Sequence, residues 1–325
     1  LNDSESHQVF WVNMVDLGSS LYAVNVQRGV GTSTNGSSSF GASLNMYTME
    51  YNPVDSRTSK VEFEFNGGMY STFREMLMAD VLLPHKLRFA MRLTKTNSDG
   101  YLYRATSDLF SYFGSFGYFG DKTSVWLDAF GGNEKTYIAW EGVSKSDLQL
   151  DRRYNPAGAY YDNEGKLQYY DKHNDYYRQQ HYQLHFRHIF NSSWQLKAAA
   201  HYTHGNGYYE QMKADKKYSS FGLPNLVLDD ETIVKRSNFI REKHLDNHFY
   251  GALVDAFYTS DAADVSFGGA VSDYLGSHFG LVSDYTYLST VGKEYYRSLR
   301  LPFRRNPHRG SDSRRPSERG GTRRR

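Results

Sequence analysis

The sequence predicts an all-β protein and, within that class, part of an antiparallel transmembrane β-barrel. Apolar and polar residues alternate over long stretches, which is typical of strands with one apolar face. These stretches are about 9–13 residues long, whereas strands of soluble proteins usually have about 5–6 residues. A tilted strand that crosses a membrane needs about 9–11 residues. The connections between the stretches are alternately short and long, as in outer-membrane barrels.

The alternation defines nine predicted barrel strands. In the first of them, Val61, Phe63 and Phe65 alternate with Glu62 and Glu64, so apolar and charged side chains point to opposite faces. The same pattern recurs along the chain, and helical periodicity is weak nearly everywhere. We predict strands at residues 60–69, 73–82, 86–96, 107–119, 123–132, 180–190, 194–204, 248–258 and 264–274.

The connections differ in length on the two sides of the predicted wall. A medium loop is expected near 97–105, and long loops near 133–177 and 205–246. Short turns on one side and long loops on the other are the pattern of an outer-membrane barrel, and a soluble sandwich rarely keeps such loops. The predicted tight turns are Pro84–His85, 120–122, 191–193 and 260–264.

The composition agrees with this fold class. Tyrosine and phenylalanine number 28 and 20, and the mean hydropathy is −0.68. No apolar run approaches the roughly 18 residues that a membrane-spanning helix requires, which excludes a helical membrane protein. Barrel strands alternate and average to a neutral hydropathy, so a barrel is compatible with these values. Cysteine is absent, which excludes a disulfide framework and a thiolate metal site.

The barrel prediction fixes which side chains face the lumen. An Arg or Lys at the lipid midplane would cost roughly 2–4 kcal/mol, so the charged faces of the strands must point inward. The predicted lumenal residues are Glu62, Glu64, Arg88, Arg92, Asp128, His181, His185, Arg187, Lys197 and His201.

Aromatic residues gather at the ends of the predicted strands. They predict the aromatic girdle of a membrane barrel, although strands prefer aromatic residues in any setting. The residues concerned are Tyr70, Phe73, Tyr118, Phe119, Trp194, Tyr202, Phe257 and Tyr258.

The glycine- and serine-rich stretch 27–45 precedes the first barrel strand. It is not a dinucleotide fingerprint, because Thr34 stands where the third glycine belongs, and it is not a Walker loop, because no lysine lies between Arg28 and Lys60. Both motifs also need a following helix, whereas 42–46 alternates like a strand. From composition alone, a flexible linker is an equal alternative.

The stretch "VNVQRGVGTSTNGSSSFGASLNM" resembles the end of the plug domain of TonB-dependent outer-membrane receptors. In that family a strand ends in a motif like V-E-V-x-R-G-P, and a last plug strand then leads into the barrel. This sequence has Asn25 for the acid and Val30 for the proline, a form that resembles receptors of the Bacteroidetes type. The stretches "DGYLYRATSDL", "KTYIAWEGV", "RRYNPAG", "HYTHGNGYYEQ" and "FYGALV" continue the resemblance over about residues 5–297.

The resemblance implies an energy-coupled transporter of the cell outer membrane that takes up a scarce ligand such as an iron chelate. Residues 1–50 are then the C-terminal part of the plug domain, and 51–297 are the N-terminal part of a 22-stranded barrel. The expected partners are outer-membrane lipid, the small-molecule ligand and a TonB-type inner-membrane energiser, whose contact segment has no counterpart before Leu1. Nine strands of 22 indicate a fragment that is inactive alone. We expect no enzymatic activity, no cofactor and no nucleic-acid partner.

The resemblance also implies a contact between plug and barrel. Arginines at the position of Arg28, which precedes Gly29, pair in the family with acids of the inner barrel wall. Glu62 and Glu64 are the candidate partners here, and an exposed loop arginine is the alternative for Arg28.

Candidate ligand-binding residues lie in the loop 154–177, which holds seven tyrosines, and on the strand that follows it. Exposed rings such as Tyr160, Tyr161, Tyr169 and Tyr170 could stack on a ligand, or they could pack against one another within a long loop. His181 and His185 are further candidates, from the lumen. They are not a metal site, because residues four apart on a strand lie about 13 Å apart.

The remaining patterns offer alternatives of other classes. No Gly-x-Ser-x-Gly elbow is present, and a secreted β-rich glycan-binding or glycan-hydrolysing protein is the second hypothesis. Residues 297–325 carry eleven arginines against two acids, a net charge of +9, which leaves −7 for 1–296. We predict an arginine-rich disordered tail over 298–325, translated from a shifted reading frame. A natural basic arm is the alternative.

Overall fold

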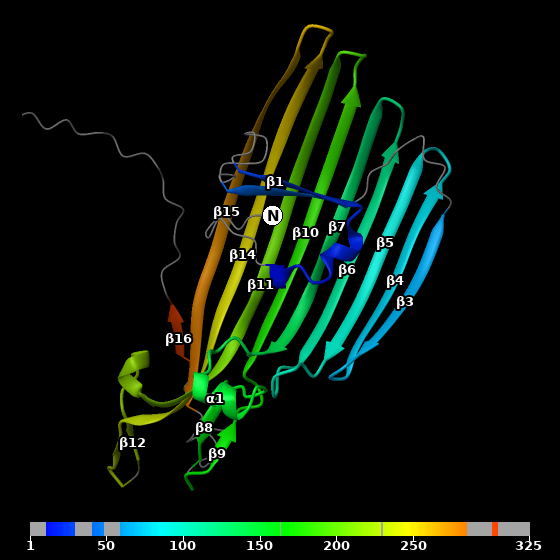
Figure 1. Cartoon of the computed structure of the whole chain (residues 1–325). Helices are drawn as coiled ribbons and strands as arrows, with labels where there is room; N and C mark the ends of the chain where they lie inside the picture. Colours follow the sequence, from blue (N-terminus) through cyan, green and yellow to red (C-terminus); the bar gives the residue numbers. More distant parts are fainter. Residues whose placement is uncertain are drawn as a thin grey trace, which may run out of the picture.

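The computed structural model describes residues 11–29, 41–48, 59–162, 164–228, 230–284 and 301–304. Its main feature is a ten-stranded antiparallel sheet, in which each strand pairs with its neighbours in chain order (Figure 1). No helix in the described parts of the chain is long and apolar enough to cross a membrane. The ten strands are β3 (Lys60–Gly68), β4 (Thr72–Leu83), β5 (Leu87–Ser98), β6 (Ser107–Phe119), β7 (Thr123–Tyr137), β10 (Asn174–Ile189), β11 (Trp194–Lys217), β14 (Arg236–Thr259), β15 (Asp264–Asp284) and β16 (Leu301–Arg304).

All nine predicted strands are present, but three of them are much longer than expected. β11 and β14 have 24 residues each and β15 has 21. β7 and β10 also extend beyond their predicted loop-side ends, so the loops expected at 133–177 and 205–246 shrink to 138–173 and 218–235. The extensions pair polar residues with one another, as Asn206 does with Asp246. In the β11 and β14 extensions polar residues occur on both faces, so the alternation that marks a strand in the sequence is weaker there.

The tenth strand was not predicted. β16 pairs with β15 from Phe279–Arg304 to Val282–Leu301. It lies within the segment that we expected to be a disordered tail, and the expectation is wrong for these four residues. The rest of 298–325, and with it the hypothesis of a shifted reading frame, lies outside the described residues.

The tight turns and the longer loops occupy opposite ends of the sheet, as predicted (Figure 1). In the turn between β4 and β5, His85 and Lys86 have φ values of 62° and 60°, the conformation of a type I′ turn. Such turns match the twist of the strands that they join. The other tight turns are at 120–122, 190–193 and 260–263.

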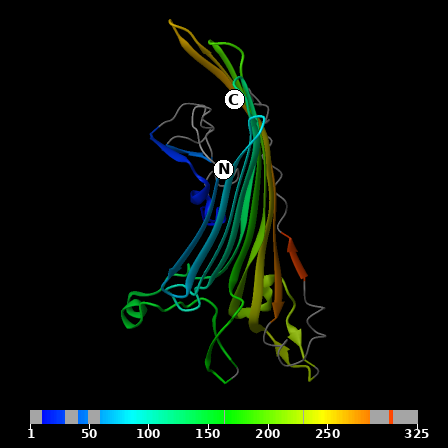
Figure 2. The same ribbon diagram turned by 90° about the vertical axis from the view of Figure 1, so that its right-hand side faces the viewer.

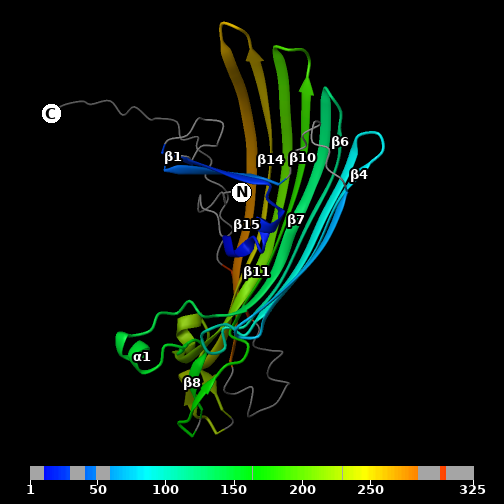
Figure 3. The same ribbon diagram turned by 45° about the vertical axis from the view of Figure 1, so that its right-hand side comes forward.

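A short segment lies against one face of this sheet (Figures 2 and 3). We call residues 11–29 and 41–48 the plug segment and the ten-stranded sheet the wall. The strands expected in this segment are confirmed, and they pair from Ala23–Tyr47 to Arg28–Ala42. The elements of the plug segment are the 3-10 helices η1 (Trp11–Asn13) and η2 (Leu17–Ser20), and the strands β1 (Ala23–Arg28) and β2 (Ala42–Tyr47).

The face of the wall that the plug segment covers is called the inner face. Apolar contacts hold the segment there, because Leu17 packs with the buried Ala90, Phe113 and Phe130. The strand registers place all ten predicted lumenal residues on this inner face, which confirms that prediction. One row across the sheet runs through Glu62, Met78, Arg92, Phe113, Phe130, His181 and Thr203.

The outer face is apolar across the middle of the wall. Phe63 is 71% exposed there, and Leu77, Leu93, Leu127 and Leu184 are exposed beside it. Three of the eight residues of the predicted aromatic girdle do not lie on the outer face of a strand. Adjacent residues of a strand point to opposite faces, so Phe119 and Phe257 lie on the inner face, and Tyr70 lies in a turn. The outer-facing members are Phe73, Tyr118, Trp194, Tyr202 and Tyr258.

Smaller elements project from the loop end of the wall (Figure 1). Tyr218 and Phe239 are buried against each other, with ring centroids 5.0 Å apart, and Val282 joins them. This cluster fixes the second long loop to the extended strands. The loop elements are α1 (Lys145–Leu150), β8 (Ala159–Tyr161), β9 (Leu167–Tyr169), η4 (Tyr218–Phe221), β12 (Leu226–Val227) and β13 (Ile233–Val234).

Candidate functional site

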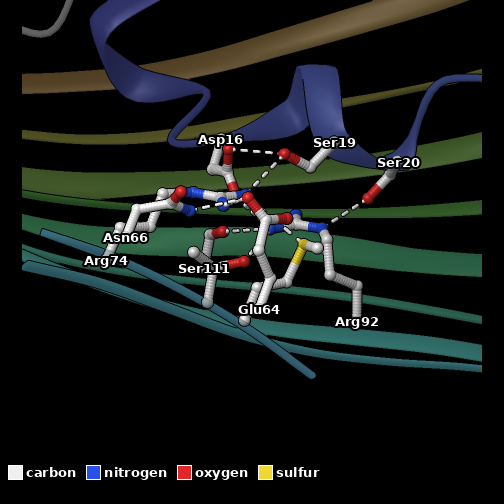
Figure 4. A network of polar contacts seen from close by, with 10 residues as sticks. Asp16, Ser19, Ser20, Glu64, Asn66, Arg74, Arg92 and Ser111 are labelled. Carbon is white, nitrogen blue, oxygen red and sulfur yellow. Dashed lines mark hydrogen bonds and ion pairs between the residues drawn. The ribbon is translucent and has the colours of Figure 1, made fainter. Parts of the chain in front are cut away.

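The plug segment is joined to the wall by a carboxylate that two arginines share (Figure 4). Asp16 lies just before η2 on the plug segment, and Arg74 and Arg92 project from β4 and β5 of the wall. The Nη2 of Arg74 and the Nη1 of Arg92 each donate to Asp16 Oδ2 at 3.0 Å. Arg74 also donates to the hydroxyl of Ser19, at 2.8 Å. The contact is therefore charged on both sides and specific in geometry.

Arg92 is the most buried charged residue of this network. Its side chain is 2% exposed, which is tolerated only when a buried charge is paired and hydrogen-bonded. Its Nε donates to Ser20 Oγ at 2.6 Å, and its Nη1 donates to Thr94 Oγ1 and Ser111 Oγ at 2.6 and 2.8 Å. The planar guanidinium thus bonds the plug segment and two wall strands together.

Asp16 is shaped for this role by its own turn. Its φ and ψ are 50° and 27°, in the left-handed region that Asp tolerates better than most residues. The hydroxyl of Ser19 donates to its Oδ1 at 2.7 Å. Burial raises the pKa of Asp16, but hydrogen bonds from Ser19, Thr94 and Arg74 and the charge of Arg92 outweigh it and hold the pKa below its usual range. The carboxylate is therefore charged at neutral pH.

The network continues along the wall towards β3. Arg74 Nη1 lies 3.2 Å from Glu64 Oε1, and Asn66 donates to the same oxygen at 2.6 Å. Glu64 is thus linked to the plug segment through Arg74, as one of the sequence-predicted contact residues. Glu62, the other predicted acid, instead forms an ion pair with Lys60 on its own strand.

Arg28 and Gly29 are not placed at this contact. Arg28 is exposed at the end of β1 and forms no ion pair with any described residue. Gly29 has φ +83°, and its N–H donates to the carbonyl of Gly41 at 2.9 Å, which closes the β1–β2 pair. Where the resemblance implied an arginine on the plug and acids on the wall, the principal contact has an acid on the plug and arginines on the wall. The interior of the glycine-rich stretch, 30–40, lies outside the described residues.

A second polar contact joins the C-terminal end of the plug segment to the wall. Thr48 Oγ1 donates to Asp128 Oδ2 at 3.1 Å, and Asp128 is buried on β7. The Nε2 of His185 lies 3.9 Å from the same carboxylate, and its ring stacks on Trp126 at 4.7 Å. His185 therefore supports the wall beneath the plug segment.

His181 lies beneath the plug segment as well. Its ring stacks on Phe130 with centroids 4.6 Å apart, and its Nδ1 lies 2.9 Å from Thr203 Oγ1. The Nε2 is buried and has no hydrogen-bond partner among the described residues. It borders a small cavity between plug and wall that Met14 and Arg92 also line. Among the described residues, neither His181 nor His185 belongs to a group of ligands that could share a metal ion.

The structure separates the four candidate tyrosines into different roles. Tyr161 on β8 is 66% exposed, and Tyr160 is beside it. Tyr169 on β9 lies under the guanidinium of Arg104, 3.6 Å from its ring centroid. Tyr170 is buried, and its hydroxyl donates to Glu210. The β8–β9 hairpin projects from the loop end of the wall (Figure 1). Because Tyr170 is buried and Tyr169 lies against Arg104, only part of this group of tyrosines faces solvent.

Sequence reasoning missed Asp16, Arg74 and the two serines of η2. The available signal was that Asp16 and Ser19 flank a short Asp-x-x-Ser turn next to apolar residues, whereas Arg74 and Arg92 lie on the polar faces of predicted strands. No spacing in the sequence pairs the two sets, because 58 and 76 residues separate Asp16 from the arginines.

The architecture is similar to solved outer-membrane receptors. The ferric-catecholate import receptor Fiu of E. coli K12 has a TM-score of 0.56 at 12% identity, over 81% of this chain and 40% of that chain. The siderophore receptor PiuA of Acinetobacter baumannii has a TM-score of 0.58 at 13% identity, over 84% and 39%. The copper transporter OprC gives 0.56 at 12% identity, over 88% and 37%. No family model and no curated protein sequence matches the chain.

The likeness covers most of this chain but only about two fifths of each of these receptors. At such low identity it identifies the fold and leaves ligand and activity open. The chain has the fold of part of an outer-membrane receptor β-barrel.

Proposed function

We propose that the chain is part of a TonB-dependent receptor of the outer membrane, of the Bacteroidetes type, that imports a scarce ligand such as an iron chelate. The observation that carries this proposal is the Asp16–Arg74–Arg92 network, which fastens a plug segment to the polar inner face of a wall whose outer face is apolar. On this proposal residues 1–50 are the end of the plug, and 51–297 are the first part of the barrel.

The outer face supports placement in lipid. Its middle carries exposed aliphatic and aromatic side chains on every strand from β3 to β15, for instance Phe63, Leu184 and Phe267. A secreted glycan-binding or glycan-hydrolysing protein would have to keep this apolar band in water, where patches far smaller than this mark interaction or aggregation sites. In a bilayer the same band contacts acyl chains. The charged inner face is then shielded from lipid, as in barrels with a polar lumen.

The polar contact between the plug segment and the wall suits a transporter whose plug must move. Each hydrogen bond that Asp16 accepts from Arg74 or Arg92 can be replaced by one to water when the segment moves. The net cost per bond is therefore modest compared with its strength in isolation. A TonB-type energiser acting on the plug would have to break a few such contacts and the small apolar cluster around Leu17. We expect this chain to be inactive alone, because it spans only about two fifths of such a receptor.

Ligand capture would occur at the loop end. The exposed Tyr161, and Tyr160 beside it, are the candidates for stacking on an incoming ligand. Tyr169 instead packs against the guanidinium of Arg104. His181 is covered by the plug segment, so a ligand would meet it only after the plug moves.

Fractionation and uptake test the proposal. The chain, secreted into the periplasm of a Gram-negative host, is expected in the outer-membrane fraction and to require detergent for extraction. The complete receptor that contains this sequence is expected to restore growth on chelated iron to a strain that lacks its own receptors. This growth should depend on the energiser. Recovery of the chain as a soluble periplasmic protein would favour the glycan-binding alternative, and uptake without the energiser would contradict the transport mechanism.

A further inference from the structure

Two histidines and an aspartate meet on the outer face of the wall, away from the plug segment. His204 is on β11, and Asp246 and His248 are on β14. We propose that these three side chains bind a divalent transition-metal ion such as Zn²⁺. This site does not depend on the transport function proposed above, and none of its residues faces the lumen.

The strand register brings the three side chains together. His204 and His248 are directly opposite each other in the β11–β14 pair, and Asp246 lies two residues from His248 on the same face. Directly opposed side chains have Cβ atoms about 4.5–5.5 Å apart. The two imidazoles accordingly stack with centroids 4.6 Å apart and planes at 11°. The nitrogen lone pairs lie in the ring planes, so the two rings must rotate out of this stack before both nitrogens point at one common position.

The ligand atoms have the spacing of a metal site. His204 Nε2 is 2.8 Å from Asp246 Oδ1, and His248 Nε2 is 3.7 Å from the same oxygen. One ligand atom from each residue lies within 4.8 Å of the other two. With Zn–N bonds of about 2.0–2.1 Å and tetrahedral angles, ligand atoms are about 3.3 Å apart. Rotation of the two imidazoles about their side-chain torsions would bring all three ligand atoms to this distance and direct them at one ion.

The chemistry of the donors selects the ion. Imidazole nitrogens suit zinc, copper and nickel, whereas calcium and magnesium take oxygen ligands. Two neutral imidazoles and one carboxylate neutralise half of a divalent charge. The three side chains are 28%, 50% and 39% exposed in the order His204, Asp246, His248, so an ion can enter and water can complete the coordination.

Tyr202 forms a hydrogen bond with one of the three proposed ligands, His248. Its hydroxyl oxygen lies 2.8 Å from His248 Nδ1. When Nε2 of His248 binds a metal, the proton is on Nδ1 and donates to this hydroxyl, which fixes both tautomer and ring orientation. Such outer partners typically change metal affinity by about 10–100-fold. Tyr202 is thus a positioning residue.

The chain provides a matched control. His244 and Glu242 form a second histidine–acid pair on the outer face of β14, with His244 Nε2 2.8 Å from Glu242 Oε2. No second histidine joins them among the metal-ligand groups of the described residues. If any partly exposed histidine–acid pair captured metal, this pair, at 19% and 21% exposed, would do so as well.

Isothermal titration of the full chain in detergent micelles with ZnCl₂, without a histidine tag, tests the site. We expect one saturable site, and at least about a tenfold loss of affinity in each of His204→Gln, Asp246→Asn and His248→Gln. Tyr202→Phe should lower the affinity by about tenfold while all ligands remain. His244→Gln should leave it unchanged, and CaCl₂ should not compete.

Circular dichroism confirms that each variant keeps its strands, and Co²⁺ absorption provides a second readout of nitrogen ligation. The proposal is overturned if the wild type shows no saturable Zn²⁺ binding. It is also overturned if the three ligand variants bind as tightly as the wild type, or if His244→Gln loses as much affinity as they do.

Discussion

Replacing Asp16 by asparagine should loosen the plug segment without altering the wall. The substitution keeps the size of the side chain but removes the charge that Arg74 and Arg92 share. Arg92 is 2% exposed, so water cannot take the place of the carboxylate, whereas Arg74 is 21% exposed and regains part of its solvation. The effect should therefore come mainly from Arg92.

The magnitude follows from these contacts. A hydrogen bond to a charged group contributes about 1.5–3 kcal/mol, and removing one partner of a fully buried ion pair costs about 3–5 kcal/mol. Because Asp16 is 20% exposed and asparagine can still accept one hydrogen bond, we expect a loss of about 2–3 kcal/mol. That corresponds to about 30- to 150-fold more frequent opening of the segment.

Hydrogen exchange measured by mass spectrometry reads this opening directly. The peptide that covers 11–22 contains the turn bonds of η1 and η2, including Ser19 N–H to the carbonyl of Asp16. Its amides should exchange faster in Asp16→Asn, and the wall strands should be unaffected. Glu75→Gln is the matched control, because it makes the same chemical change at an exposed position of β4. Exchange of this peptide within threefold of the wild type in Asp16→Asn would refute the reasoning.

The same network predicts a pH dependence and a coupling. The pKa of Asp16 is lowered in the folded chain, so its contribution is present above the unfolded value of about 3.9 and is lost as pH falls through the folded pKa. Exchange of the 11–22 peptide, corrected for the intrinsic rate, should accelerate only below about pH 4. In an Arg92→Met background the effect of Asp16→Asn should shrink, because the two side chains act on one interaction. Equal effects of Asp16→Asn in both backgrounds would show that the lost stability does not come from the Asp16–Arg92 interaction.

Three further predictions concern the loops and the outer face. Burial, and to a smaller extent the charges of Lys213 and Arg104, lower the pKa of His173 to about 4. The stabilising contribution of the neutral ring is therefore complete above the unfolded pKa of 6.5 and is lost as pH falls from 6.5 to about 4. Proteolysis of the loop 138–173 should therefore increase at pH 4, and less so in His173→Asn; an equal increase in both would contradict this. Gly158→Ala should open the same loop, because a Cβ there would lie 2.4 Å from the hydroxyl of Tyr137. Gly165 has the same φ of +77° but lies in open space, so Gly165→Ala should cost only about 1–2 kcal/mol of stability. Similar proteolysis of the two variants would refute the packing argument. Leu184→Arg should destabilise the folded state in bilayers by about 2–4 kcal/mol, whereas Arg at the neighbouring inner-face position, in Gln183→Arg, should not. The folded yield is measured by heat-modifiable gel mobility, and equal yields of the two variants would contradict contact of Leu184 with lipid.

Much of the wall could be predicted from the sequence because a membrane-type strand carries its own signal. The period of two in 60–69 or 86–96 indicates both the strand and the faces of its side chains, and all ten predicted lumenal residues lie on the inner face. The prediction weakened where this signal ends. The extensions of β11 and β14 have polar residues on both faces, so the alternation is weak there and gives little sign of their backbone pairing.

The aromatic girdle shows a related limit. Tyr118 and Phe119 are neighbours in the sequence, as are Phe257 and Tyr258, and grouping them by position at strand ends ignored the pleat. Only one of each pair can face outward, and the register decides which.

The sequence by itself determined the local rules of this protein: where nine of the wall strands lie, which of their faces are polar, and where the tight turns fall. These follow from hydrophobic periodicity and turn chemistry, which act over a few residues. Only the tertiary structure decided that Asp16 meets Arg74 and Arg92, 58 and 76 residues away, and that His204 faces His248. Such partners are chosen by sheet register and by the docking of the plug segment. Both are set by the summed backbone pairing and packing of many residues, which no local spacing encodes.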